Sequence, residues 1–338
     1  INSDDAYTNI VGVTLDISCD DLGSGCDYVE YSNDGVTYNS VTGDLTSQVP
    51  GDGAYTISPT WDLTGGDETK TVTVRVWDKA GNSTIKTDTI LYDSTDPTGD
   101  IEIDGGATYD NDGDVALSAN CYDIGQAENS GCASIEYSND NSTWSALEAF
   151  VSNPTETQTN WALDTSVQGE RSVYIRLKDN AGNVTTSTIS DTIFYDSVLP
   201  TGSVVINNDA VETNNISATL NMSCSDGGDA LTDSGCATVE YSIDAGASWT
   251  PATPEAITDG SFDTTDFVLD TDVPLLDGIK DIQIRLTDAA GNADIFTDEI
   301  LYDANAPTVT FVINSDDAYT NIVGVTLDIS CDDLGSGC

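Results

Sequence analysis

The sequence predicts an all-β protein made of several similar β-sandwich domains in tandem. Apolar and polar residues alternate in short runs, such as T-V-T-V-R-V-W-D at 71–78, with the period of a half-buried strand. Turns rich in Gly, Asn and Asp separate these runs, and no stretch of the sequence has a convincing helical period. The pattern also repeats, because a strand-like run ends in a cysteine every 102 to 107 residues, at Cys19, Cys121, Cys224 and Cys331.

A second recurring pattern marks the ends of the repeated domains. The motif D-x-A-G-N is followed by a strand that ends in Y-D, and P-T comes after three more residues. This pattern predicts four domains, here called repeats 1 to 4, at residues 1–97, 98–200, 201–307 and 308–338. Repeat 4 is only a beginning, and its residues 313–338 are identical to residues 1–26. We therefore expect the sequence to be a window from a longer array, with any anchor or secretion signal outside it.

The strand pattern favours one type of sandwich. Val13, Leu15 and Ile17 share one face of a predicted strand with Val11. About six or seven short strands in each repeat favour antiparallel immunoglobulin-like sandwiches in an extended array. The third and sixth strands are neighbours in that topology. The outward-facing Arg75, Arg176 and Arg285 should therefore lie opposite Glu30, Glu136 and Glu240.

The charge of the chain excludes some partners. Acidic residues outnumber basic ones 59 to 9, and there is no histidine. Such a chain repels nucleic acid and anionic lipid, so we expect neither nucleic-acid binding nor membrane insertion in this window. The acidity has two readings, namely solubility in a salty exterior and the binding of divalent cations.

The eight cysteines form four close pairs, which predicts one local disulfide in each repeat and an extracellular or cell-surface location. Five N-x-S/T sequons are possible glycosylation sites. The predicted disulfides are Cys19 with Cys26, Cys121 with Cys132, Cys224 with Cys236, and Cys331 with Cys338. The sequons begin at Asn82, Asn141, Asn183, Asn215 and Asn221.

The runs Y-S-N-D-x-x-x-W, R-x-x-D-x-A-G-N and Y-D-x-x-x-P-T carry a resemblance across repeats 1 to 3. Together they resemble the tandem bacterial Ig-like domains of large surface adhesins and biofilm-associated proteins and, at a distance, cadherin repeats. The resemblance implies an extended extracellular rod that is often made rigid by Ca²⁺ at the domain junctions. The local cysteine pair is unusual among those adhesins. The resemblance therefore leaves two alternatives for the protein, an adhesin and a covalently reinforced structural fibre.

The sandwich topology also predicts where carboxylates gather. The loop after the second strand and the turn after the sixth lie at the same pole, which receives the linker from the preceding repeat. Oxygen ligands from three segments would suit Ca²⁺, although D-x-A-G-N is also simply a good tight turn. The candidate ligands are Asp93, Asp96, Asp123, Asp179 and Asn183 at the first junction, Asp196, Asp226, Asp288 and Asn292 at the second, Asp303 and Asp332 at the third, and Asp20, Asp78 and Asn82 in repeat 1.

We expect no enzymatic activity, because the chain has no imidazole base and no G-x-S-x-G or phosphate-binding motif. The leading hypothesis is a structural segment of a giant secreted microbial repeat protein that forms a surface fibre, stalk or filament. Its partners would be copies of itself or neighbouring repeats. The alternative is an adhesin whose array spaces, or contributes, domains that bind a host or cell-surface ligand.

Overall fold

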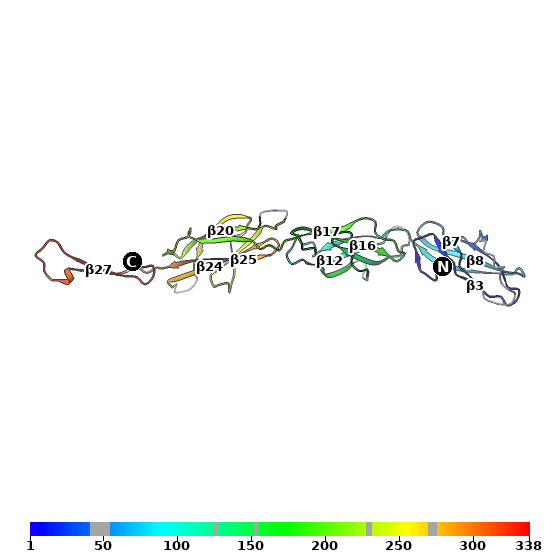
Figure 1. The fold of residues 1–338 in the computed structure, drawn as a ribbon, viewed down its shortest axis with the longest axis horizontal. Helices are drawn as coiled ribbons and strands as arrows, with labels where there is room; N and C mark the ends of the chain where they lie inside the picture. The colour runs from blue at the N-terminus through cyan, green and yellow to red at the C-terminus, as the bar shows by residue number, and fades with distance from the viewer. Residues whose placement is uncertain (41–54, 125–127, 152–154, 228–231, 270–275) are drawn as a thin grey trace. The chain divides into compact units, whose positions relative to one another are not determined.

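The computed structural model describes residues 1–40, 55–124, 128–151, 155–227, 232–269 and 276–338 (Figure 1). The fold is all-β, with tandem immunoglobulin-like sandwiches, as the alternating sequence pattern predicts. The described residues contain one short 3₁₀ helix, η2 (Asn314–Asp316). No helix in this part of the chain is long and apolar enough to cross a membrane.

The chain forms two compact units. The first contains Ile1–Ala107, Asp114–Leu163 and Ser172–Thr192, and the second contains Thr108–Gly113, Asp164–Arg171 and Ile193–Cys338. The predicted repeat boundaries stay a prediction.

Repeat 1 contributes a five-stranded sheet in the order β1-β9-β8-β4-β5 and two small two-stranded sheets, β2-β7 and β3-β6. The short β1 pairs with β9 in parallel, and every other strand pair here is antiparallel. The strands are β1 (Tyr7–Thr8), β2 (Gly12–Thr14), β3 (Ile17–Cys19), β4 (Cys26–Ser32), β5 (Asn39–Ser40), β6 (Tyr55–Ile57), β7 (Thr60–Asp62), β8 (Glu68–Asp78) and β9 (Ser83–Tyr92).

Repeat 2 contributes a sheet in the order β11-β17-β16-β13-β14 and a three-stranded sheet, β10-β12-β15. The edge strand β10 runs antiparallel to β12, with Thr98 opposite Tyr122 and Ile103 opposite Leu117. The strands are β10 (Thr98–Ile103), β11 (Tyr109–Asp110), β12 (Asp114–Tyr122), β13 (Cys132–Ser138), β14 (Glu148–Ala149), β15 (Thr155–Ala162), β16 (Gly169–Asp179) and β17 (Ile189–Tyr195).

Repeat 3 has the same plan, with sheets β19-β25-β24-β21-β22 and β18-β20-β23, and repeat 4 contributes the two-stranded β26-β27. The strands are β18 (Thr201–Ile206), β19 (Glu212–Thr213), β20 (Ser217–Ser225), β21 (Cys236–Ser242), β22 (Thr250–Ala256), β23 (Gly260–Val268), β24 (Gly278–Asp288), β25 (Ala293–Tyr302), β26 (Thr308–Ile313) and β27 (Leu327–Asp332).

The cores lie on the inward faces predicted by the alternation. Ile282, Ile284 and Leu286 on β24 are fully buried, because every second side chain of a strand points to the same face. In repeat 1, Val13 and Leu15 are buried as predicted, whereas Val11 is 39% exposed. Val11 precedes β2, so the strand alternation does not extend to it.

The predicted Arg–Glu pairs are confirmed. Glu30 lies directly opposite Arg75, and the same register recurs in repeats 2 and 3. Arg176 Nη2 lies 2.6 Å from Glu136 Oε2, and Arg285 also pairs with Glu240. The three guanidinium groups also lie over the rings of Tyr38, Trp144 and Trp249. These aromatic side chains therefore cover the arginines on the outer face of the sheet.

Candidate metal centre

Three buried aspartates meet where repeat 1 leads into repeat 2. Asp93 follows β9, Asp123 follows β12, and Asp179 is the last residue of β16. Their exposed fractions are 0%, 6% and 1%. One carboxylate oxygen from each lies within 4.8 Å of the others, and we call this group the first triad.

The loop before β13 holds two of these carboxylates with its backbone. Ser130 N donates to Asp93 Oδ2 at 2.7 Å, and Gly131 N donates to Asp123 Oδ2 at 2.6 Å. Gly131 has φ +77°, a conformation that glycine adopts without strain. Two successive N–H groups that point into one concavity form an anion-binding nest. The loop that ends at the start of β13 in repeat 2 thus binds Asp93, the aspartate of the preceding linker.

The D-x-A-G-N turn supplies the third carboxylate and orients it. Asp179 Oδ1 accepts hydrogen bonds from Gly182 N at 2.6 Å and Asn183 N at 2.8 Å. Asn183 Nδ2 donates to Asp179 Oδ2 at 2.7 Å and to the backbone oxygen of Asp93 at 2.9 Å. Asn183 therefore links the turn to the linker through its amide nitrogen.

A second triad has the same plan at the next junction. Asp196, Asp226 and Asp288 are 0%, 1% and 3% exposed, and one oxygen from each lies within 4.8 Å of the others. Ser234 N donates to Asp196 Oδ2 at 2.6 Å, and Gly235 N donates to Asp226 Oδ2 at 2.7 Å. The matching amide, Asn292 Nδ2, donates to Asp288 Oδ2 and to the backbone oxygen of Asp196.

Both triads lack positive charge. Their hydrogen-bond donors are neutral backbone and amide groups, and no ion pair among the described residues includes a triad carboxylate. Asp123 Oδ1 and Asp226 Oδ1 are buried without a hydrogen-bond partner. Burial raises the pKa of Asp123, Asp179 and Asp288, and it raises the pKa of Asp226 to about 6.

This donor set fits a hard divalent cation. The converging groups are carboxylate oxygens, with no thiolate or imidazole among them, and Ca²⁺ takes six to eight oxygen ligands in flexible geometry. Two of the buried oxygens have no other partner, so a cation would use lone pairs that the fold leaves free. Each triad can therefore hold a cation, with Asn183 or Asn292 as an orienting group.

At the third junction the structure brings together fewer of the predicted ligands. Asp303 Oδ2 accepts hydrogen bonds from Ser336 N at 2.6 Å and Ser336 Oγ at 2.7 Å. The pKa of Asp303 is lowered mainly by the hydrogen bond from the Ser336 hydroxyl. Asp332 is exposed and lies opposite Thr308, as Tyr122 lies opposite Thr98. Asp333 is therefore the counterpart of Asp123 and Asp226, a position that the sequence analysis missed.

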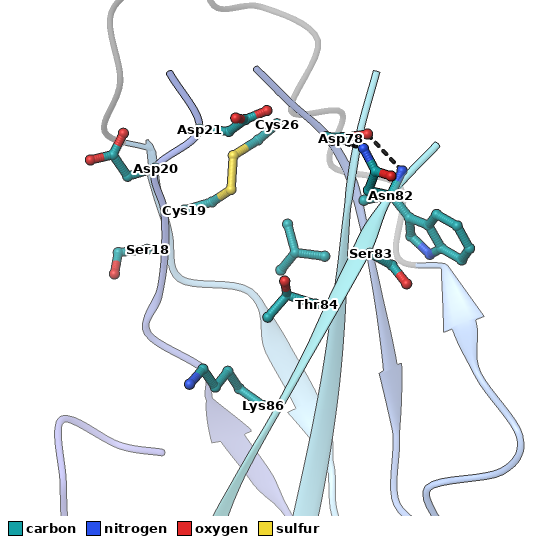
Figure 2. A pocket seen from close by; sticks show the side chains of 12 residues that line it. Ser18, Cys19, Asp20, Asp21, Cys26, Asp78, Asn82, Ser83, Thr84 and Lys86 are labelled. Atoms are coloured by element: carbon teal, nitrogen blue, oxygen red, sulfur yellow. Dashed lines mark hydrogen bonds between the residues drawn. A yellow bond between two sulfur atoms is a disulfide. The ribbon is translucent and has the colours of Figure 1, made fainter. Parts of the chain in front are cut away.

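Repeat 1 has the same offset at its own pole. The residue two places after Cys19 is Asp21, whereas the sequence analysis named Asp20. Figure 2 shows Asp20 on the opposite side of the Cys19–Cys26 disulfide from Asp78 and Asn82. Asn82 donates to Asp78 through both its backbone and its side chain, so the turn is built as in repeats 2 and 3. The spacing C-x-D, visible at Cys121 and Cys224, would have identified Asp21 and Asp333.

The remaining predicted ligand, Asp96, lies outside the first triad. Its Oδ2 accepts a hydrogen bond from Thr186 Oγ1 at 3.0 Å. This hydrogen bond connects the linker to the segment between β16 and β17 of repeat 2.

All four predicted disulfides are formed, with Cα–Cα distances of 6.1 to 6.5 Å. Cys121 lies in β12, two residues before Asp123, and Cys132 begins β13 directly after Gly131. The disulfide in repeat 2 therefore closes the base of the loop that carries Asp123 and the Ser130–Gly131 nest. The disulfide of repeat 3 has the same relation to Asp226.

The predicted glycosylation sites differ in accessibility. Asn82, Asn141 and Asn215 are exposed, and Asn221 is half-buried. Asn183 is 8% exposed, and its side-chain nitrogen makes the two hydrogen bonds described above. A glycan at Asn183 would replace one of these hydrogens, so it is incompatible with the folded turn.

No family model matches the chain, and no curated protein matches it. Among solved structures, it is similar to a Ca²⁺-stabilised adhesin with which an Antarctic bacterium binds ice, with 20% identity, coverage of 94% of this chain and 74% of that one, and a TM-score of 0.42. The tetra-tandem repeat in the extending region of a large adhesion protein has 17% identity, coverage of 96% and 85%, and a TM-score of 0.29. The fibronectin(III)-like modules of Clostridium thermocellum CbhA have 15% identity, coverage of 60% and 93%, and a TM-score of 0.33. These solved structures thus include adhesin repeats and fibronectin(III)-like modules, each with 20% sequence identity or less to this chain.

Proposed function

We propose that the chain is a structural segment of a giant secreted microbial repeat protein that forms a fibre, stalk or filament at the cell surface. Ca²⁺ bound at the two triads stiffens the junctions, and one local disulfide reinforces each repeat. The observation that supports this proposal most directly is the burial of the linker carboxylates Asp93 and Asp196 beside two further buried carboxylates from the next repeat.

A bound cation would offset the negative charge of the buried triads. Three buried carboxylates repel one another, and transferring a charge out of water is costly unless it is compensated. A cation that binds only the folded junction stabilises it by a free energy that rises with the logarithm of the free ion concentration. With a dissociation constant of about 10⁻⁴ M, typical of extracellular modules, a tenfold excess of free ion contributes about 1.4 kcal/mol.

Direct hydrogen bonds hold the linker from the other side. Asp67, just before β8, accepts hydrogen bonds from Ser94 N at 3.0 Å and from Thr95 Oγ1 at 2.5 Å. Gln168 makes the corresponding bonds with Ser197 at the second junction. Each linker is thus fixed by the preceding repeat as well as by the following one, which supports a stiff connection.

Direct hydrogen bonds between repeats 1 and 2 also support a stiff junction. Glu128, in the cysteine loop of repeat 2, accepts hydrogen bonds from the backbone and the hydroxyl of Thr69 on β8 at 2.7 and 2.6 Å. This loop therefore contacts the preceding repeat as well as the linker.

Calorimetric titration of the full chain with Ca²⁺ tests the cation, and small-angle scattering with Ca²⁺ and then with excess chelator tests the stiffness. We expect binding at two sites, loss of one site in Asp179→Asn and of the other in Asp288→Asn, and greater flexibility in chelator. Asp281→Asn, which removes an exposed carboxylate from β24, is the matched control and should keep both sites. Absence of binding heat together with an unchanged scattering profile would refute the cation-stiffened junction.

A further inference from the structure

The two triads share one plan, but they differ in a neighbouring residue of the cysteine loop. At the second junction, Asp233 lies directly before Ser234, the residue whose backbone nitrogen binds Asp196. At the first junction, the residue directly before Ser130 is Asn129. Asn129 is exposed, whereas Asp233 is half-buried. The loop of repeat 3 therefore has a partly buried carboxylate where the loop of repeat 2 has an exposed, neutral amide.

A glycine makes room for this carboxylate. Gly227 directly follows Asp226 of the second triad, and it has φ +63°. A Cβ atom at Gly227 would collide with both carboxylate oxygens of Asp233. The Asp233 carboxylate thus lies against the backbone of the residue next to Asp226. The first triad has Ile124 at the corresponding place after Asp123, and Ile124 is 74% exposed.

The charge of Asp233 reaches the second triad. Burial is the main cause that raises the pKa of Asp226, and the other two carboxylates of its triad and that of Asp233 raise it further. The pKa of Asp123 is raised by burial and then by the other two carboxylates of the first triad. Asp226 therefore interacts with three like charges, and Asp123 with two.

The repeat 2 loop also contains an acidic side chain, but this one contacts the preceding repeat. Glu128 accepts hydrogen bonds from the backbone nitrogen and the hydroxyl of Thr69, which lies on β8. Glu128 is exposed, so solvent and salt screen its charge. It does not take the place that Asp233 has beside the second triad.

Nearby negative charge strengthens the binding of a divalent cation to oxygen ligands, and it does so most where the charge is partly withdrawn from solvent. We propose that Asp233 makes the second triad the tighter of the two cation sites, so that the two junctions bind Ca²⁺ and stiffen at different Ca²⁺ concentrations. Asp233 is not among the carboxylates whose oxygens converge in the triad, so it acts through its charge and not as a ligand.

This difference gives the array a graded response to Ca²⁺. At a Ca²⁺ concentration between the two dissociation constants, the junction between repeats 2 and 3 is mostly occupied and the junction between repeats 1 and 2 is mostly free. One joint is then stiff while the joint before it is compliant. The inference rests on the proposed function, because it requires Ca²⁺ to bind at both triads.

Calorimetric titration of two full-chain variants with Ca²⁺ compares the sites one at a time. Asp179→Asn disables the first triad and leaves the second, and Asp288→Asn does the reverse. We expect the dissociation constant of the second triad to be about tenfold lower than that of the first. Raising the ionic strength should reduce this difference, because an effect of charge without ligation is screened by salt.

Removal of the charge tests the residue itself. In the Asp179→Asn background, Asp233→Asn introduces the residue type that the first junction carries at this place, and the Ca²⁺ affinity of the second triad should fall about tenfold. Asp281→Asn in the same background removes an exposed carboxylate from β24 and is the matched control, which should leave the affinity unchanged.

Two kinds of failure can be told apart in these titrations. Equal dissociation constants at the two triads, or equal effects of Asp233→Asn and Asp281→Asn, would overturn the inference and leave the proposed function in place. The first of these comparisons needs no substitution at Asp233, so it holds even if Asp233→Asn disturbs the loop. Absence of binding heat at both triads would refute the role of the cation itself, and this inference with it.

Discussion

The charge of Asp226 leads to a prediction in which removal of a buried carboxylate stabilises the protein without cation, and in which this gain is reduced or reversed with cation. Burial raises the pKa of Asp226 from 3.8 to about 6. The difference of about 2 pH units corresponds to about 3 kcal/mol of destabilisation of the ionised form at neutral pH. Asp226→Asn removes this charge and keeps an oxygen that can accept the hydrogen bond from Gly235 N.

In chelator, the apparent melting temperature of Asp226→Asn should exceed that of the unsubstituted chain, by about 12 °C or more if repeat 3 unfolds as an independent domain. In Ca²⁺ this difference in melting temperature should become smaller or change sign, because the variant lacks one carboxylate of the cation site. The measurement is differential scanning calorimetry in both conditions, with Asp281→Asn as the control for net charge.

The same group sets a pH dependence in chelator. A folded-state pKa above the unfolded value means that the protonated carboxyl favours folding. The stability is therefore present below pH 4 and is lost as the pH rises from about 4 to about 6, with no further loss from this group above that window. Asp226→Asn should lack this decline. If the variant melts below the unsubstituted chain in chelator, or if both show the same decline with pH, the reasoning about the buried charge is refuted.

Three further predictions concern the disulfides, the turn glycine and the outer face. Replacing Cys121 and Cys132 by alanine should lower the free energy of unfolding of repeat 2 by about 3 kcal/mol, and an unchanged denaturant midpoint would contradict this. Gly182→Ala should cost about 1–3 kcal/mol by thermal unfolding, because φ is +102°, whereas Gly65→Ala, at an open position without positive φ, should not; equal effects would argue against strain. Arg176→Met should cost about 1 kcal/mol or less and change the fluorescence of Trp144, since its ion pair with Glu136 is partly exposed, and a loss of several kcal/mol would contradict a surface role.

Sequence alternation was sufficient to predict the strand faces and one cross-strand register. Arg75 and Glu30 could be paired in advance because each lies between inward-facing apolar residues, and because the sandwich topology makes their strands neighbours. Val11 could not be placed in the same way, because alternation continues in the sequence past the point where β2 begins at Gly12. The end of a strand depends on pairing with another segment, which the local pattern does not contain.

The candidate site was predictable in its residue types and less so in its positions. Asp93, Asp123 and Asp179 come from segments that the topology brings to one pole, and the structure places them together. The sequence analysis named Asp20 and Asp332, whereas the strand register places Asp333 at the position of Asp123, and the C-x-D spacing favours Asp21. Two consecutive aspartates leave the local pattern unable to show which one faces the junction. The role of Ser130 was not visible in its side chain, because its backbone N–H is the group that binds Asp93.

Gly99 and Gly202, whose backbone lies close to Leu177 and Leu286 of the facing sheet, also bear on how an array of near-copies folds. Adjacent domains of similar sequence are prone to exchange strands while they are being synthesised. A strand with valine at the position of Gly99 is excluded, because its Cβ would lie 2.1 Å from the Asn120 backbone oxygen and 2.7 Å from Leu177 Cδ1. A strand with glycine at this position would make less contact with Val76, which lies opposite Val29 in repeat 1 as Leu177 lies opposite Ile135 in repeat 2. One error is thus blocked by collision and the other is disfavoured by poor packing. Alternating the bulk of a single contact between strand and sheet gives each domain a preference for its own first strand, which is a means of folding fidelity in a long, repetitive chain.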